Sequence, residues 1–211
     1  MQYHKIQTVF KRDPETQLKT LLHGEYSLPE FEYLANNEWV FTEKVDGTNI
    51  RVMWDGERIT FGGKTDNAQI PAFLVTRLQE LFPQNIFNAK KIFDVDVNDT
   101  CLYGEGYGAK IQKGGGNYKP DGVDFVLFDV RVGQWWLKRE DVENIAWKLG
   151  LGIVPIIGEG TLLNMLALAE SGYKSTWGDF KAEGIVARPK VELKTRGGQR
   201  IITKIKHKDF A

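Results

Sequence analysis

The segment Thr42 to Val52, Thr-Glu-Lys-Val-Asp-Gly-Thr-Asn-Ile-Arg-Val, constrains the fold of this chain more than any other. Apolar residues precede it from Trp39, and an alternating apolar set follows it from Ile50, which predicts two strands. Asp46-Gly47 between them is a strong turn signal. Lys44 is therefore expected at the end of a strand, where nearby cations or a metal would lower its pKa and make it a nucleophile. A solvated lysine beside a common turn explains this motif alone equally well.

Composition indicates one folded, cytoplasmic protein. The 211 residues suffice for one substantial core, and we expect a single domain over residues 1–211. No stretch is long enough to span a membrane, and the N-terminus lacks the apolar segment of a signal peptide, so we expect neither export nor membrane insertion. Cys101 is the sole cysteine, which excludes an internal disulfide and, with three scattered histidines, argues against a structural zinc site.

Charge is unevenly distributed along the chain. The formal net charge is zero, which argues against a protein that coats nucleic acid by bulk electrostatics. Residues 181–211, however, hold nine Lys or Arg against three acidic residues. A solvated basic tail and a polyanion site explain this excess equally well.

The rest of the chain predicts an α+β domain dominated by antiparallel sheet. Strands are expected over residues 38–44, 48–54, 58–62, 100–105, 125–132, 135–137, 153–157, 184–189 and 200–206. Helices are expected where apolar residues recur at helical spacing, near residues 73–82, 142–149 and 162–169. Gly150 would end the second and Thr161 cap the third. Residues 1–37 are predicted as loops with a short helix or strand, and Gly114-Gly115-Gly116 as a mobile loop.

Four further stretches carry candidate functional residues. They are Leu102 to Gly106, Asp124 to Asp129, Ala182 to Ala187, and Thr203 to Lys206. In the last, period-two alternation places Lys204 and Lys206 on one strand face, where two ammonium groups would clamp an anion. Each has an ordinary explanation when taken singly: Glu105 and Glu183 as surface carboxylates, Phe125 as a core residue, and the lysines as protection of an edge strand.

Taken in order, these motifs resemble those of the covalent nucleotidyltransferases, which include ATP-dependent ligases and messenger RNA capping enzymes. Within that superfamily the chain most resembles the RNA ligase 2 family, typified by a bacteriophage T4 enzyme. The resemblance is carried by Glu43 to Asn49, Lys64-Thr65, Tyr103 to Glu105 with Ile111 to Lys113, Phe125 to Asp129, Glu183 to Val186, and Lys204 to Lys206. It implies an antiparallel-sheet-rich nucleotidyltransferase fold, the ATP-grasp-like adenylation domain of ligases. With asparagine at position 49 the chain resembles the RNA ligase branch, since DNA ligases and capping enzymes usually carry arginine at this position.

The resemblance implies an ATP-dependent RNA ligase. Lys44 would attack the α-phosphate of ATP, release pyrophosphate and carry AMP through a phosphoramidate bond. AMP would then move to an RNA 5′-phosphate, and a 3′-hydroxyl would displace it to seal the strand. Lys204, Lys206 and Glu183 would be catalytic with Lys44, the two lysines neutralising phosphate charge together with Mg²⁺ or Mn²⁺.

The remaining implied roles concern the metal and the nucleotide. Asn49, Glu105 and Glu183 would hold the metal directly or through water, whereas Glu105 would alternatively bind the ribose hydroxyls. The sequence leaves this choice open.

The adenine and the phosphates have their own implied contacts. Glu43 and nearby backbone groups would read the exocyclic amine, and Phe125 would stack on the adenine. Lys64 lies in a Lys-Thr-Asp run where the family usually has Arg-Thr-Gly. Lysine keeps the positive charge of arginine but lacks the planar guanidinium that can donate two parallel hydrogen bonds to a phosphate.

The expected partners are ATP and RNA, and we expect a monomer. A basic face of Arg188, Lys190, Lys194, Arg196 and Arg200 would contact the RNA backbone in a salt-sensitive manner. Relatives of the T4 type carry a helical C-terminal domain after the last motif, so we expect the adenylyltransferase domain alone here. The alternatives are a DNA ligase core, a capping-type nucleotidyltransferase, or a nucleotide- or RNA-binding module without catalysis.

Overall fold

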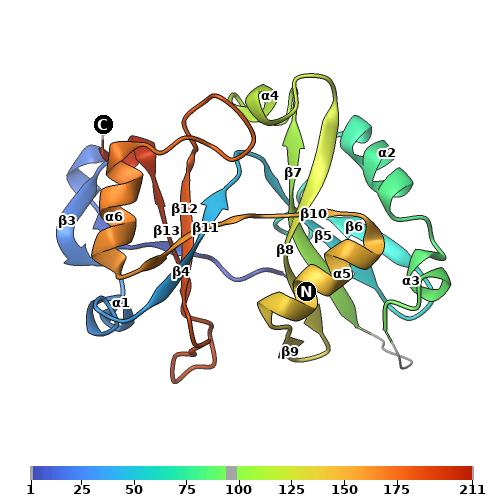
Figure 1. The fold of residues 1–211 in the computed structure, drawn as a ribbon, viewed down its shortest axis with the longest axis horizontal. Helices are drawn as coiled ribbons and strands as arrows, with labels where there is room; N and C mark the ends of the chain where they lie inside the picture. Colours follow the sequence, from blue (N-terminus) through green and yellow to red (C-terminus); the bar gives the residue numbers. More distant parts are fainter. Residues whose placement is uncertain (1, 94–98, 211) are drawn as a thin grey trace. The chain divides into compact units, whose positions relative to one another are not determined.

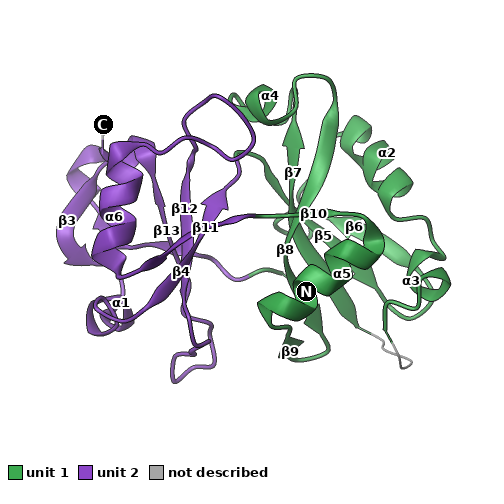
Figure 2. Ribbon diagram, viewed as in Figure 1, with its two compact units in different colours: residues 1–3, 46–154 green, residues 4–45, 155–211 purple. Residues whose placement is uncertain are grey.

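The computed structural model describes residues 2–93 and 99–210. The chain divides into two compact units, unit 1 with residues 1–3 and 46–154, and unit 2 with residues 4–45 and 155–211 (Figure 2). Neither unit is one continuous segment. The sequence predicts a single domain and shows no linker at the points where the chain passes between the units.

Unit 1 is built on a sheet with the strand order β10-β8-β7-β5-β6, to which β9 adds beside β8 (Figure 1). Its strands are β5 (Thr48–Trp54), β6 (Ile59–Gly62), β7 (Thr100–Gly108), β8 (Val123–Val132), β9 (Trp135–Trp136) and β10 (Gly152–Ile153). Its helices are α2 (Ala72–Leu81), α3 (Ile86–Ala89), α4 (Gly115–Tyr118) and α5 (Arg139–Leu149). All strand pairs are antiparallel except β10 with β8. Apolar side chains of β5, β7 and β8 pack with α2 and α5 to form the core of this unit.

Unit 2 is built on a sheet with the strand order β1-β13-β12-β4-β11 and a separate β2-β3 pair. Its strands are β1 (Gln7–Thr8), β2 (Phe10–Arg12), β3 (Leu21–Tyr26), β4 (Trp39–Lys44), β11 (Ile156–Gly160), β12 (Gly184–Pro189) and β13 (Thr203–Lys206). Its helices are α1 (Pro29–Tyr33) and α6 (Leu162–Ser171), with the 3₁₀ turns η1 (Pro14–Thr16) and η2 (His207–Phe210). The core lies between the sheet and α6.

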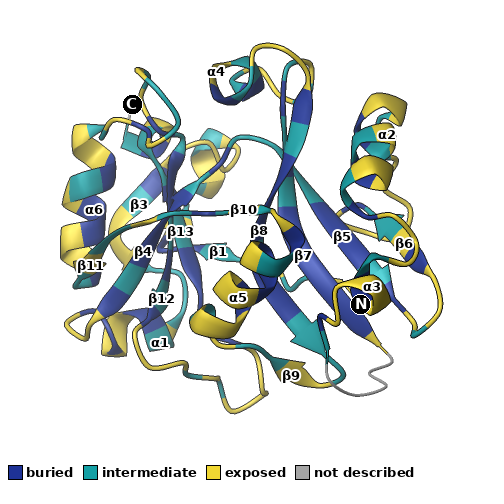
Figure 3. Cartoon of the chain, turned by 45° about the vertical axis from the view of Figure 1, so that its right-hand side comes forward, coloured by how far each residue is buried: buried dark blue, intermediate teal, exposed yellow. Residues whose placement is uncertain are grey.

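Burial fixes the register of β4, the strand that carries Lys44 (Figure 3). Trp39 and Phe41 are 0% and 2% exposed and point into the core, so Lys44 falls on the opposite face. Burying each aromatic ring contributes on the order of 1.5–3 kcal/mol. A slip by one residue would expose both rings, which makes this register strongly preferred.

Local signals placed several elements correctly. Thr161 caps α6 with a capping box, in which its side chain accepts from the Asn164 N–H and the Asn164 side chain accepts from the Thr161 N–H. Gly150 ends α5 in the left-handed region with a φ of 74°. The strands β4, β5, β6, β12 and the helix α2 lie where the patterns predict them. In the described part of the chain no helix is both long and apolar enough to cross a bilayer.

Three expectations need correction. The strand predicted over residues 153–157 is two strands, β10 in unit 1 and β11 in unit 2, separated around Pro155, which has no N–H for a ladder. The three glycines at 114–116 form the start of α4 rather than a mobile loop. Residues 7–33 contain three strands, a 3₁₀ turn and a helix, more regular structure than predicted.

Candidate functional site

In unit 2 three lysines share one face of the sheet. Lys44 of β4 pairs with Gly184 of β12, and Gly184 pairs with Lys206 of β13. Two residue pairs along the same strands, Val186 stands opposite Lys204. Since directly paired residues point to the same side, Lys44, Lys204 and Lys206 lie on the face opposite the core.

Glu183 joins two of these lysines. Its Oε2 atom lies 2.5 Å from Nζ of Lys44, and its Oε1 atom lies 2.6 Å from Nζ of Lys206. The side chain of Glu183 is 14% exposed, and those of Lys44 and Lys206 are 19% and 24% exposed, so both ion pairs are largely shielded from water. Charge-assisted bonds of this length are strong when shielded in this way. Each carboxylate oxygen of Glu183 contacts one lysine, and the metal-ligand role expected for Glu183 stays a prediction.

Gly184 makes this arrangement possible. A Cβ atom at this position would lie 2.2 Å from the carbonyl oxygen of Ile205. This distance is too short for any residue with a side chain. The strand between Lys44 and Lys206 therefore carries no side chain at that point. Glu183 is present for its contacts with the two lysines, and glycine follows it because no side chain fits at position 184.

Glu43 is buried, not directed toward a ligand. It is 1% exposed, on the core face of β4. Its carboxylate accepts hydrogen bonds from the Ser175 hydroxyl at 2.5 Å, and from the Thr176 amide and hydroxyl at 2.9 and 3.0 Å. The reading of the adenine amine by Glu43 and nearby backbone groups stays a prediction, and in this structure the carboxylate oxygens of Glu43 contact Ser175 and Thr176. Glu43 instead anchors the loop that contains Ser175 and Thr176 beside Lys44.

In unit 1 Asn49 and Glu105 are direct cross-strand neighbours of β5 and β7. Both side chains face away from the core, because Ile50, the next residue of β5, points into the core. Oδ1 of Asn49 is buried and has no hydrogen-bond partner among the described residues. A buried acceptor left unpaired costs about 1–3 kcal/mol, which a bound cation or donor would relieve.

These two side chains fit a hard divalent cation. Amide and carboxylate oxygens are the ligands that Mg²⁺ and Mn²⁺ prefer, and Mg²⁺ usually keeps several waters. In residues 2–93 and 99–210 no group of three or more His, Cys, Asp or Glu side chains is arranged around a metal position. The donors of unit 1 thus suit a metal that is held by few protein ligands.

The turn after Lys44 is tied to two other segments of unit 1. A Cβ atom at Gly47 would lie 2.3 Å from the carbonyl oxygen of Gly106, so only glycine fits there. Oδ2 of Asp46 accepts a hydrogen bond from the Gly114 N–H at 3.1 Å. The glycines of residues 114–116 therefore help to hold the turn that follows the predicted nucleophile.

Phe125 is a core residue in this structure. It is 2% exposed, packs edge-to-face on Phe82 at 5.5 Å between ring centroids, and lies against Gly104. Its ring lies on the core side of the sheet, whereas Asn49 and Glu105 face the other side. The stacking of Phe125 on adenine stays a prediction, and in this structure the ring packs within the core of unit 1.

Lys64 is exposed, and the segment around it is held by a residue that sequence reasoning missed. Arg51 is 1% exposed, donates from Nε to the Gly63 carbonyl at 2.7 Å, and forms an ion pair with Asp66 at 2.8 Å. Asp66, the third residue of the Lys-Thr-Asp run, also accepts from Gln2 at 3.0 Å. The signal in the sequence was a charged residue within an apolar strand, followed by the small pair Gly62-Gly63.

Asp124 and Cys101 are among the titratable groups of unit 1 whose pKa values are perturbed. Burial opposes ionisation of Asp124, but hydrogen bonds from Lys119 and Arg77 outweigh it and hold its pKa below the ordinary value. Burial raises the pKa of the Cys101 thiol to about 11. Cys101 is therefore a protonated core thiol at neutral pH.

The predicted basic face is partly neutralised. Lys190 lies 2.7 Å from a carboxylate oxygen of Glu159, and the guanidinium of Arg200, 2% exposed, pairs with Glu192 at 2.8 Å. Lys194 and Arg196 are exposed. The positive charges of this run are therefore partly compensated, by Glu159 of β11 and by Glu192 within the run itself.

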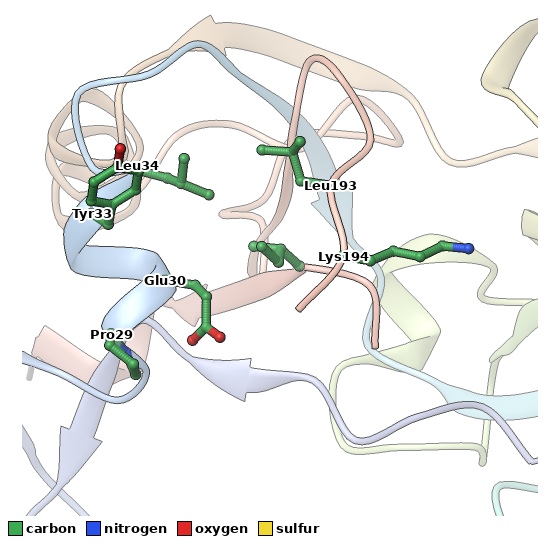
Figure 4. A pocket seen from close by; sticks show the side chains of 7 residues that line it. Pro29, Glu30, Tyr33, Leu34, Leu193 and Lys194 are labelled. Carbon is green, nitrogen blue, oxygen red and sulfur yellow. The ribbon is translucent and has the colours of Figure 1, made fainter. Parts of the chain in front are cut away.

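A pocket of about 410 Å³ in unit 2 contains none of the residues predicted to bind nucleotide (Figure 4). Helix α1 contributes Tyr33 and the adjoining Leu34 to one side, and the hairpin before β13 contributes Leu193 to the other. Tyr33 is 87% exposed at its rim. The lining is largely apolar and offers little for a phosphate.

Comparison with known proteins places this geometry in context. A model of the RNA ligase family matches residues 37–206. A comparison with curated protein sequences found no match. Among solved structures, a point mutant of Naegleria gruberi RNA ligase with AMP and Mn is similar with a TM-score of 0.65 at 18% identity, over 95% of this chain and 56% of that one.

Two further structures of the Naegleria gruberi enzyme have similar TM-scores. The RNA ligase with PPi has a TM-score of 0.64 at 20% identity, over 96% of this chain and 56% of that one. A point mutant with ATP and Mn has a TM-score of 0.63 at 20% identity, over 84% and 52%. The chain thus spans little more than half the length of these ligases and shares their fold. Because the family model extends over most of the chain, from before Lys44 to Lys206, the chain belongs to the RNA ligase family.

Proposed function

We propose that this chain carries out the ATP-dependent adenylylation chemistry of an RNA ligase of the RNA ligase 2 type, with Lys44 as the nucleophile. The observation that carries the proposal is the Lys44–Glu183–Lys206 arrangement on one sheet face of unit 2. A structural lysine at a strand end would not need a shielded carboxylate that also holds a second lysine. Membership of the RNA ligase family supports the same reading.

In the first step the amine of Lys44 attacks the α-phosphorus of ATP. An N–P bond forms, the bond from that phosphorus to the bridging oxygen breaks, and pyrophosphate leaves with the bonding pair. Lys44 must lose a proton, and Oε2 of Glu183 at 2.5 Å is the nearest acceptor in unit 2. Lys204 and Lys206 stabilise negative charge on the phosphate oxygens.

Asn49 and Glu105 would hold the divalent cation, directly or through water. When bound, that ion supplies Lewis-acid neutralisation of phosphate charge. The unpaired Oδ1 of Asn49 supports this assignment, and the cross-strand position of Glu105 supports its participation. Glu105 remains the candidate for the ribose hydroxyls as well.

In the second and third steps the AMP group moves to an RNA 5′-phosphate and is then displaced by a 3′-hydroxyl. The phosphodiester forms as AMP leaves. The RNA substrate is proposed from the family, because Lys190 and Arg200 of the predicted basic face are paired with carboxylates. We propose that Lys194 and Arg196, the exposed cations of the hairpin, contribute salt-sensitive backbone contacts.

The test is transfer of label to the protein. Purified protein is mixed with Mg²⁺ and α-labelled ATP or GTP, denatured, and checked for label that travels with the polypeptide. Label from ATP but not GTP, absent in Lys44→Ala and retained in the exposed control Lys11→Ala, is the expected result. Absence of label in wild-type protein whose intact mass shows no bound AMP would contradict the proposal and favour a binding module.

A further inference from the structure

Asp209 is a buried carboxylate outside the predicted catalytic set. It lies in η2, directly after the strand that carries Lys204 and Lys206, and its side chain is 2% exposed. A buried carboxylate is costly unless charges and hydrogen bonds compensate it. Its contacts therefore indicate what it stabilises.

Both oxygens of Asp209 are engaged. Oδ2 accepts the backbone N–H of Lys206 at 3.0 Å, and Oδ1 pairs with Nη2 of Arg12 at 3.0 Å. Arg12 lies in β2 and also donates from Nη1 to the carbonyl groups of Leu18 and Lys19. The carboxylate thus connects the end of β13 to the β2–β3 pair.

The same strand end is bonded to the residue that contacts Lys44. The backbone N–H of His207 donates to the Glu183 carbonyl at 3.0 Å, while the Lys206 ammonium contacts the Glu183 carboxylate. The main chain at residues 206 and 207 is therefore held from two sides, by Asp209 and by Glu183. Terminal strand residues otherwise fray readily, because few ladder bonds restrain them.

We propose that Asp209, supported by Arg12, is a positioning residue for Lys206 in the adenylylation of Lys44. This inference rests on the proposed function. Asp209 does not contact the reacting atoms; it fixes the backbone from which the Lys206 side chain reaches Glu183. Displacement of a catalytic group by about 1 Å can reduce a rate by about 10²-fold, so a fixed strand end matters to the chemistry.

The test is a double-mutant cycle on the rate of lysyl-AMP formation. Rates are measured under single-turnover conditions over a range of labelled ATP concentrations up to saturation, for wild type, Asp209→Ala, Lys206→Ala and the double variant. We expect Asp209→Ala to lower the maximal rate by about 10-fold or more with a smaller change in KM. In the Lys206→Ala background the same change should have almost no further effect, because the group it positions is gone.

Three controls keep the result interpretable. Lys208→Ala alters an exposed residue of the same 3₁₀ turn and should leave the rate unchanged. Arg12→Ala should reproduce part of the Asp209→Ala loss. Thermal unfolding of each variant verifies that the protein is folded at the assay temperature.

The outcomes separate this inference from the function on which it rests. Equal fractional losses in both backgrounds would show that Asp209 acts only on general stability, and would overturn the inference. An unchanged rate in folded Asp209→Ala would also overturn it. Failure of wild-type protein to form lysyl-AMP would instead refute the proposed function itself.

Discussion

The ammonium group of Lys44 lies 2.5 Å from Oε2 of Glu183, a carboxylate that is only 14% exposed. Attack on ATP requires the neutral amine, so a proton must leave Lys44 before the N–P bond forms. Lys206 contacts the other oxygen of the same carboxylate at 2.6 Å. Reactivity at Lys44 therefore depends on a shared carboxylate as well as on nearby cations.

Glu183→Gln should slow lysyl-AMP formation. The amide keeps the size of the side chain but removes the charge that pairs both lysines and the acceptor for the Lys44 proton. We expect a loss of about 10²-fold in the label-transfer rate, typical of removing a proton-transfer group. The exposed Glu170→Gln serves as the matched control, and equal rates in the two variants would contradict the role of Glu183.

Asn49→Ala should raise the metal requirement of adenylylation. The substitution removes a buried oxygen that has no partner among the described residues. The Mn²⁺ concentration for half-maximal label transfer should rise by about 10-fold, and Asn49→Asp should largely restore it because an oxygen ligand returns. The exposed Asn67→Ala should leave the metal titration unchanged; a matching shift there would rule out a specific role for Asn49.

Glu43→Ala should destabilise unit 2. The change removes the acceptor for three hydrogen bonds from Ser175 and Thr176, and the buried Ser175 hydroxyl loses the acceptor of its proton. We expect the free energy of unfolding to fall by about 1–3 kcal/mol in chemical denaturation. Glu32→Ala, at an exposed position of α1, is the comparison, and a loss no larger than in that variant would contradict the anchoring role.

The contribution of Asp124 to stability should disappear in acid. Its pKa is lower in the folded state than the ordinary value of 3.8, because its hydrogen bonds with Lys119 and Arg77 outweigh burial. The stabilisation is therefore complete above the unfolded pKa and is lost as pH falls through the folded pKa. Urea unfolding should show wild type more stable than Asp124→Asn at pH 7, with the difference shrinking below about pH 4. A constant difference across this range would argue against ionisation as its source.

Cys101 should resist alkylation in the native protein. It is 0% exposed, and burial raises its pKa to about 11, so at pH 8 almost no thiolate is present. Mass spectrometry after iodoacetamide treatment should show no adduct under native conditions and rapid modification in denaturant. Rapid native modification would mean that the β7 region opens readily.

Local chemistry made several elements readable from the sequence. The Asp46-Gly47 turn, the alternation through β5 and the capping box at Thr161 depend on neighbours a few residues away, so short patterns contain the necessary information. Phe125 illustrates the limit of a motif. The pattern implies a base-stacking ring, while the packing of Phe82 and Gly104 places that ring in the core.

The sequence by itself determined the alternation of the main strands, the positions of α2, α5 and α6, the same-face placement of Lys204 and Lys206, and the motifs that point to the RNA ligase family. Only the tertiary structure decided that Glu183 contacts both Lys44 and Lys206. It also decided that the Glu43 carboxylate accepts hydrogen bonds from Ser175 and Thr176, and that Asp209 holds the end of β13. The physical reason is separation along the chain. Lys44 and Glu183 are neighbours only because β4 and β12 pair, and long-range pairing depends on the packing of whole layers, which no local pattern records.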